Sequence, residues 1–275
     1  MKKTIYRVSL VLNLVFLLLA AIVLVKKFDS IKYRLEKATD KSVFVINSDI
    51  RGAYAEQFDN IPYLTKKERI TKKNAKSDFS LLVIGNSLAL HEKNEAIGWN
   101  HESGMVASSL KHDYVHLLAK KISNARNTNI NVTIINAAEF ERNIKSVNLS
   151  RFEETEEPFD AVIVQLGENI SDYDLTIYEN SIVENISQLF SLYNADVKII
   201  CLPFWFSAKE NEIFTKIAID NNLYICDLSH IGMVADSFAS YDVKYENEGI
   251  GKHPGNKGME RISEAMFSVI QAASK

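Results

Sequence analysis

The chain is poor in cysteine, proline and glycine, with 2, 4 and 10 of these residues among 275. Two cysteines, Cys201 and Cys226, are too few for a disulfide scaffold, and neither lies in a Cys-x-x-Cys pair or beside a histidine. The sparse proline and glycine exclude a low-complexity tract, and no internal repeat is evident. We therefore expect both cysteines to be small buried residues, with a single bridge between neighbouring strand ends as the alternative.

An excess of basic charge is also lacking. The formal net charge is −3, and no long basic run occurs outside the N-terminus. Nucleic acid is therefore not expected as a partner. Hydrophobic residues make up 47% of the chain and charged residues 24%, which is close to the globular average and predicts a packed core.

A long apolar run occurs near the N-terminus, at residues 8–25, where only two side chains are polar. A helix needs about 20 such residues to cross a membrane, so this stretch is just long enough. A cleaved signal peptide is the alternative. However, Ala20-Ala21 continues into four more apolar residues and then Lys26-Lys27. We predict that residues 1–27 form an uncleaved membrane anchor.

The orientation of this anchor depends on basic residues that flank it on both sides. The two sides are nearly balanced, with Lys2, Lys3 and Arg7 before the run and Lys26, Lys27 and Lys32 after it. We expect a single-pass protein with its folded domain outside the cytoplasm. Residues 28–78, which begin with a charged, helix-compatible segment, are predicted to be a juxtamembrane stalk or linker.

From residue 79 onward, short apolar runs alternate with longer segments of helical period. This alternation is typical of βαβ units and a parallel sheet. The predicted strands are 80–84, 132–135, 161–166, 197–202 and 223–226. Residues 177–193 and the last segment, from Met259 to Ile270, have the periodicity of amphipathic helices. We expect an α/β domain over 79–275 whose chemistry lies beyond the carboxyl ends of five parallel strands.

Three of these strand ends carry residues that fit nucleophilic catalysis. Gly85-Asn86-Ser87 follows the first strand, Gly167-Glu168-Asn169 follows the third, and His253-Pro254 precedes the last helix. A serine hydroxyl needs a neighbouring base, which His253 would supply. The Asn169 amide could donate to the negative oxygen that develops on a substrate carbonyl. Each motif alone is weak, because Gly-Asn-Ser is also ordinary turn composition.

Together these blocks resemble the SGNH (GDSL-type) hydrolases over about residues 79–275. The stretches 97–99, 104–108, 113–116 and 253–259 look like a bacterial subgroup of that family. The resemblance implies a flavodoxin-like three-layer α/β/α fold and an acylated Ser87. In this family the first block holds the serine (here Gly85-Asn86-Ser87), the second follows the second strand, and the third holds an asparagine (here Gly167-Glu168-Asn169). The resemblance also implies an oxyanion hole made by the Ser87 N–H, a backbone N–H of the second block, and Gly167 and the Asn169 side chain of the third block.

The sequence departs from the family pattern at two places. Asn136-Ala137-Ala138 stands where the second block usually has glycine, so Ala137 or Ala138 would be the backbone donor. The family's aspartate three residues before the histidine is replaced by Ile250. Glu246, Glu248 and a backbone carbonyl remain as alternatives for orienting His253.

Two further features have simpler interpretations. His112 and His116 have a spacing that can bind zinc, but no third ligand is evident, so we expect packing or surface roles. Residues 203–206 (Pro-Phe-Trp-Phe) follow the fourth strand and could form an aromatic wall for a sugar or acyl group. No metal or cofactor is predicted.

The sequence thus predicts a serine esterase that removes acyl or acetyl groups from a carbohydrate or related ester, with a small molecule or polysaccharide as its partner. An O-acyltransferase that uses the same serine and histidine is the nearest alternative. A non-catalytic binding domain that has lost the triad acid is the third, because a fold alone does not establish activity.

Overall fold

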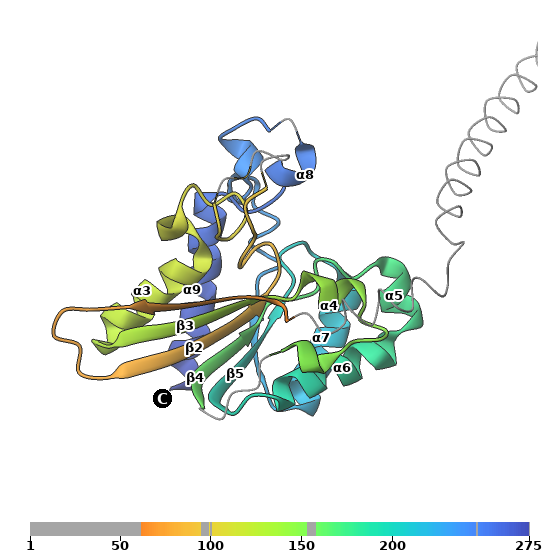
Figure 1. Ribbon diagram of the computed structural model, residues 1–275. Helices are drawn as coiled ribbons and strands as arrows, with labels where there is room; N and C mark the ends of the chain where they lie inside the picture. Colours follow the sequence, from red (N-terminus) through yellow and green to blue (C-terminus); the bar gives the residue numbers. More distant parts are fainter. Residues whose placement is uncertain (1–61, 95–98, 100, 153–157, 246, 275) are drawn as a thin grey trace, which may run out of the picture. The chain divides into compact units, whose positions relative to one another are not determined.

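A computed structural model describes residues 62–94, 99, 101–152, 158–245 and 247–274. These residues form a six-stranded sheet with helices on both faces (Figure 1). The strands are β1 (Leu64–Ile70), β2 (Asp78–Gly85), β3 (Asn129–Asn136), β4 (Phe159–Val164), β5 (Ala195–Leu202) and β6 (Tyr224–Asp227). The helices are α3 (Tyr114–Arg126), α4 (Ala138–Arg142), α5 (Asp172–Ile177), α6 (Glu179–Ser191), α7 (Ala208–Asp220), α8 (Glu248–Gly251) and α9 (Asn256–Ala273). Single 3-10 turns occur at Leu110–His112, Leu149–Arg151, Ala235–Ser237 and Ala239–Tyr241.

The sheet order is β1-β3-β2-β4-β5-β6, and β2 to β6 all pair in parallel. The five predicted parallel strands are confirmed. The predicted strand number is wrong, because β1 adds a sixth strand that runs antiparallel to β3. Residues 64–70 lie in the segment expected to be a linker, yet they pair with β3 along their whole length, Leu64 with Asn136 and Ile70 with Ile130.

Alternating side chains of the sheet build two cores, one on each face. In β2, Leu81 and Val83 pack with α3 and α9, whereas Leu82 and Ile84 pack with the residues of α4 to α7. The period of 2 along a strand produces this division. The helices accordingly form two layers around the sheet, which completes the three-layer arrangement (Figure 1).

The predicted helical faces are largely confirmed. α6 buries Ile182, Ile186, Leu189 and Phe190, and α9 buries Met259, Ile262, Met266 and Ile270. The helix predicted over 177–193 is α6, which is shorter by two residues at each end; Ile177 is the last residue of α5.

The two cysteines occupy facing positions on the neighbouring strands β5 and β6. Cys201 is directly opposite Cys226 in the register, and both are buried free thiols. They are core residues, as expected, and no disulfide joins them.

The predicted anchor, residues 1–27, and the stalk up to residue 61 lie outside the described residues. Of the helices that the structure does describe, none combines the length and the apolar composition needed to span a membrane.

Candidate active site

Ser87 lies directly beyond the carboxyl end of β2. Asn86 is completely buried, while Ser87 is half-buried. Gly85 allows this turn to pack closely, because a Cβ there would come 2.7 Å from the Cβ of Ala89. The first block therefore holds the serine hydroxyl at the sheet edge where ligands bind in open parallel sheets.

The structure brings Ser87 and His253 together across 166 residues of sequence. Ser87 Oγ lies 3.2 Å from His253 Nε2, and His253 Nδ1 lies 3.0 Å from the Gly249 carbonyl oxygen. A carbonyl oxygen can only accept, so the proton of the neutral imidazole is on Nδ1. Nε2 therefore presents its lone pair to the serine, which is the arrangement that a general base requires.

The Gly249 carbonyl occupies the place of the missing triad acid. Glu248, on the same short helix α8, is exposed and makes no hydrogen bond to His253. Glu246 lies outside the described residues. Of the three alternatives, the backbone carbonyl is the one whose contact with His253 is observed.

Trp205 provides further support for the histidine ring. Its ring meets that of His253 edge-on, with centroids 5.4 Å apart and planes at 86°, and its Nε1 donates to the Lys252 carbonyl at 3.2 Å. Burial lowers the pKa of His253 below its usual 6.5. His253 is therefore neutral near pH 7 and able to accept a proton.

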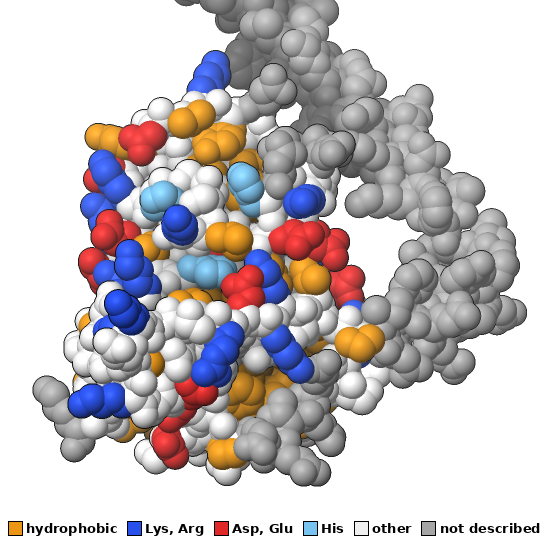
Figure 2. Space-filling model, turned by 60° about the vertical axis from the view of Figure 1, so that its left-hand side comes forward, with side chains coloured by type: hydrophobic (Ala, Val, Ile, Leu, Met, Phe, Trp, Pro, Cys, Tyr) orange, Lys and Arg blue, Asp and Glu red, His pale blue; other side chains and the backbone are white. Residues whose placement is uncertain are grey.

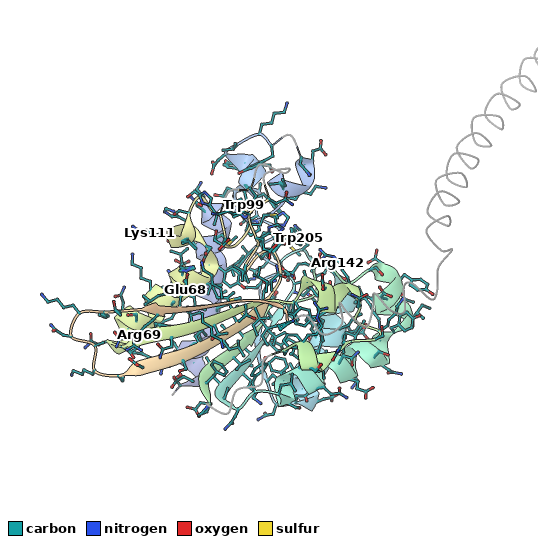
Figure 3. All side chains as sticks on the ribbon, viewed as in Figure 1. Glu68, Arg69, Trp99, Lys111, Arg142 and Trp205 are labelled. Carbon is teal, nitrogen blue, oxygen red and sulfur yellow. The ribbon has the colours of Figure 1, made fainter. Side chains whose placement is uncertain are left out.

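A cavity of about 500 Å³ opens over Ser87 and His253. Its lining includes the apolar Pro62, Leu64, Met105 and Ala138 together with polar and charged side chains: Tyr63, His91, Glu92, Asn136, Glu139, Arg142, Arg151 and Asn169. Glu139 and Arg151 form an ion pair at 2.7 Å. In Figure 3, Arg142 and Trp205 both lie near the carboxyl edge of the parallel strands. Residues of both charge signs therefore surround the serine.

The predicted aromatic wall is not part of this cavity. Phe204 is fully buried in the core, Trp205 packs against His253, and Phe206 is 55% exposed. The face shown in Figure 2 likewise mixes positive and negative side chains with scattered hydrophobic ones, rather than presenting one large patch.

The predicted oxyanion donors are unequally available. The Ala137 N–H donates to the Gly85 carbonyl at 2.6 Å, and the Gly167 N–H donates to Glu141 at 2.5 Å. The Ala138 N–H is also engaged, at 2.9 Å from Asn136 Oδ1. By contrast, the Ser87 N–H donates to no acceptor within the described residues.

Asn169 faces the same cavity as Ser87. Its Nδ2 donates to Glu141 Oε2 at 2.6 Å, and its Oδ1 accepts from Arg142 at 3.1 Å. A side-chain amide nitrogen carries two N–H groups, so one remains for a ligand. Gly167 lets the third block turn here with φ of 128°, which favours glycine, and a Cβ would lie 2.7 Å from Glu210 Oε1.

Behind these donors lies a buried cluster of three carboxyl groups, Glu141, Glu168 and Glu210. Burial and the nearby Glu168 raise the pKa of Glu141 to about 8, despite three N–H donors. Burial also raises the pKa of Glu168. Burial, together with Glu168 and Glu141, raises the pKa of Glu210 to about 9. Near pH 7 the cluster therefore retains protons that exposed glutamates would have lost.

Asn86 connects Ser87 to this cluster. Its amide nitrogen donates to Glu168 at 2.7 Å and to Glu141 at 3.1 Å, and its Oδ1 accepts from the Leu88 N–H. Aspartate is common at this position in the family that the sequence resembles. An aspartate here would add a fourth carboxyl group to the cluster, in direct contact with Glu141 and Glu168, so the neutral asparagine avoids this repulsion.

The two histidines with metal-like spacing make separate contacts. His112 is exposed and bonds Ser108 and Ser109, whereas His116 lies between Asp113, at 2.8 Å, and Glu68 of β1, at 2.6 Å. Within the described residues, no group of three such side chains has the arrangement of a metal site.

The three-layer fold, the order of the motif blocks and the Ser87–His253 contact together resemble the SGNH (GDSL-type) hydrolases. No family model matches the chain, and no curated protein matches it.

Several solved structures are similar to the chain at low identity. A lipolytic protein of the G-D-S-L family from Desulfitobacterium hafniense is 16% identical with a TM-score of 0.40, over 69% of this chain and 98% of its own. A carbohydrate esterase family 2 enzyme from Corynascus thermopiles is 14% identical with a TM-score of 0.46, over 74% of this chain and 69% of its own. A lipase/acylhydrolase from Enterococcus faecalis is 15% identical with a TM-score of 0.42, over 70% of this chain and 96% of its own. These values are too low to assign a function, which has to be argued from the site itself.

Proposed function

We propose that the protein is a carboxylic ester hydrolase that works through a Ser87–His253 couple. The observation that carries this proposal is the 3.2 Å contact of Ser87 Oγ with His253 Nε2 in an open cavity. The Gly249 carbonyl keeps the imidazole in the required tautomer. A serine with a purely structural role would not require an oriented, neutral imidazole such as that of His253, nor a backbone N–H without an acceptor, as Ser87 has among the described residues.

In the first half-reaction, Ser87 Oγ attacks the ester carbonyl carbon and its proton passes to His253 Nε2. The developing oxyanion receives hydrogen bonds from the Ser87 N–H and from the second N–H of Asn169. Each such donor contributes about 2.7–4 kcal/mol to an acyl-transfer transition state. The tetrahedral intermediate then expels the alcohol, which takes the proton from His253, and Ser87 is left acylated.

In the second half-reaction, water attacks the acyl-serine and gives a proton to His253. Collapse releases the carboxylic acid, and the proton returns to Ser87 Oγ. The imidazolium that forms in each half is stabilised by the dipole of the Gly249 carbonyl rather than by a carboxylate, so a moderate rate is expected.

The lining of the cavity favours an alcohol portion rich in hydroxyl groups. Arg142, Glu92 and the Glu139–Arg151 pair provide charged donors and acceptors near the serine, beside a smaller apolar part of the lining that includes Met105. A small acyl group on a carbohydrate fits this mixture better than a long fatty-acyl chain does.

The proposal is tested by hydrolysis of p-nitrophenyl acetate by the full-length chain in detergent. Ser87→Ala should reduce kcat by about 10³-fold or more, with an unchanged thermal unfolding profile. Equal activity in the two proteins would refute the nucleophile. Product analysis with an acetylated sugar and a second sugar as acceptor separates hydrolysis from acyl transfer. Absence of turnover on both substrates would favour a binding function.

We further propose that residues 8–25 anchor the protein in a membrane with the hydrolase domain outside the cytoplasm. The support is the 18-residue apolar run, which nearly matches the thickness of the hydrocarbon core. Added protease should digest the domain in intact cells. Protection of the domain would contradict the orientation, and release into the aqueous fraction would contradict the anchor.

A further inference from the structure

The side-chain amide of Asn169 is held from both ends by two consecutive residues of α4. Glu141 Oε2 accepts from Asn169 Nδ2 at 2.6 Å, and Arg142 donates to Asn169 Oδ1 at 3.1 Å. An arginine can only donate, so the oxygen of the amide must face Arg142 and the nitrogen must face Glu141. Both the rotation and the orientation of the amide are therefore determined.

Glu141 is anchored well enough to hold this amide in place. It is fully buried, and its Oε1 accepts from the Gly167 N–H and from Asn86. Asn86 adjoins Ser87 on the β2 loop, whereas Gly167 lies on the loop after β4. One carboxyl group thus joins the nucleophile loop, the third block and its own helix, which follows β3.

We propose that Glu141 and Arg142 are positioning residues that aim the second N–H of Asn169 at the oxyanion site. This inference rests on the proposed function. It assigns a role to α4 that the sequence motifs do not contain. An amide fixed in advance stabilises the developing charge without reorganising during the reaction. Loss of this fixed orientation of the Asn169 amide should therefore lower kcat rather than change KM.

Glu141→Gln is the most selective change. Glutamine keeps the size of the side chain, but a single oxygen cannot accept from Asn169, Gly167 and Asn86 as two did. We expect kcat for p-nitrophenyl acetate to fall about 10- to 100-fold, with KM changed less than threefold. Arg142→Ala should lower kcat about fivefold, and Arg142→Lys, which keeps a donor, should restore most of the loss.

Glu210→Gln is the matched control. Glu210 belongs to the same buried cluster and lies against Gly167, but it makes no hydrogen bond to an oxyanion donor. Its replacement should leave kcat within about twofold of the parent value. A comparable loss in Glu210→Gln would mean that Glu141 acts through the packing of the cluster.

A double-mutant cycle with Asn169→Ala tests whether Glu141 works through Asn169. In the Asn169→Ala background, Glu141→Gln should cost less than about twofold in kcat, because the amide that it holds is already gone. Full additivity of the two losses would overturn the positioning role. This result differs from failure of the proposed function, which would appear as activity in the parent chain that does not depend on Ser87.

Discussion

The environment of Asn86 makes the identity of that residue unusually critical. It is completely buried and donates to both Glu141 and Glu168. Asn86→Asp would replace a donor with another negative charge beside two carboxyl groups. We expect the substitution to cost about 3 kcal/mol or more, because it would leave an uncompensated charge in a buried site, and to cost less at pH 5, where Glu141, whose pKa is raised to about 8, is protonated.

Urea unfolding at pH 8 and pH 5 measures this difference. Asn124→Asp, on the exposed side of α3, provides the control and should change stability by less than about 0.5 kcal/mol. If Asn86→Asp were as mild as that control at pH 8, the carboxyl groups around Asn86 would not impose the electrostatic cost predicted here.

His253 predicts the pH dependence of the reaction. Only the neutral imidazole accepts the serine proton, and burial lowers the pKa of His253 below 6.5. The value of kcat/KM should therefore rise with pH and level off, with an inflection below 6.5. Glu248→Gln should leave this inflection in place and activity within about twofold, because Gly249 contacts Nδ1. A large loss in that variant would reinstate Glu248 as the triad acid.

Some residues of the candidate site can be predicted from the sequence, and others cannot, for physical reasons. Ser87 and Asn169 follow strand ends, and His253 precedes the last helix, so the pattern of short motifs at these places marks all three. The Gly249 carbonyl leaves no trace in the sequence, because every residue has one. Glu141 bonds partners 26, 28 and 55 residues away, so its role emerges only after three loops have come together.

At the scale of secondary structure, β1 is held to β3 by sheet pairing and to α3 by an ionic link. His116 of α3 lies between Asp113 and Glu68, the latter on β1 (Figure 3 labels Glu68). Burial alone would lower the pKa of His116, but hydrogen bonds and charge from Asp113 and Glu68 outweigh it and raise the pKa above 6.5. The folded protein therefore retains this proton more strongly than the unfolded chain does.

The stabilisation from this proton is fully present below pH 6.5 and is lost as the pH rises through the higher folded-state pKa. The stability difference between the parent chain and His116→Gln should accordingly be largest near pH 6 and shrink toward pH 9, as measured by urea unfolding. His112→Gln, at an exposed site, should show no such trend. A difference that is constant with pH would contradict the ionic link.

The strand β1 itself was missed because its sequence, LTKKERI, carries four charged residues and no fully buried side chain. Period-2 alternation is the usual signal of a strand, and it needs one apolar face. β1 is an edge strand whose backbone pairs with β3, and that pairing is invisible in side-chain composition. Charged residues on an edge strand also discourage pairing with other chains. The inner strands, buried on both faces, were predicted correctly from their apolar runs.

At the scale of the whole molecule, the buried acid cluster makes folding depend on pH. Burial and the neighbouring carboxylates raise the pKa of Glu210 to about 9, against 4.5 for an ordinary glutamate. The folded state thus holds a proton that the unfolded chain releases above pH 4.5. Stability should fall as the pH rises between these two values, by up to about 1.4 kcal/mol per pH unit from this group.

Glu210→Gln removes this titration while keeping the shape of the side chain. Relative to the parent chain, its Tm should rise steadily between pH 5 and pH 9, by up to about 10–20 °C across the range, because each kcal/mol shifts the Tm of a domain of this size by about 2–4 °C. Calorimetry at several pH values measures the trend. If Tm changed with pH in the same way in the parent chain and in Glu210→Gln, then Glu210 would be ionised in the folded protein.

The direction of β1 also has a mechanical consequence. Because β1 runs antiparallel to β3, it begins at the edge where the parallel strands end, and Pro62, Tyr63 and Leu64 border the cavity. A parallel strand would have begun at the opposite edge. If residues 8–25 are held in a membrane as proposed, the 36 residues from 26 to 61 connect them to the chain at Pro62, beside the cavity that contains Ser87. At no more than about 3.6 Å per residue, this connection would keep the cavity within roughly 130 Å of the lipid surface, which would limit the proposed esterase to substrates near the membrane.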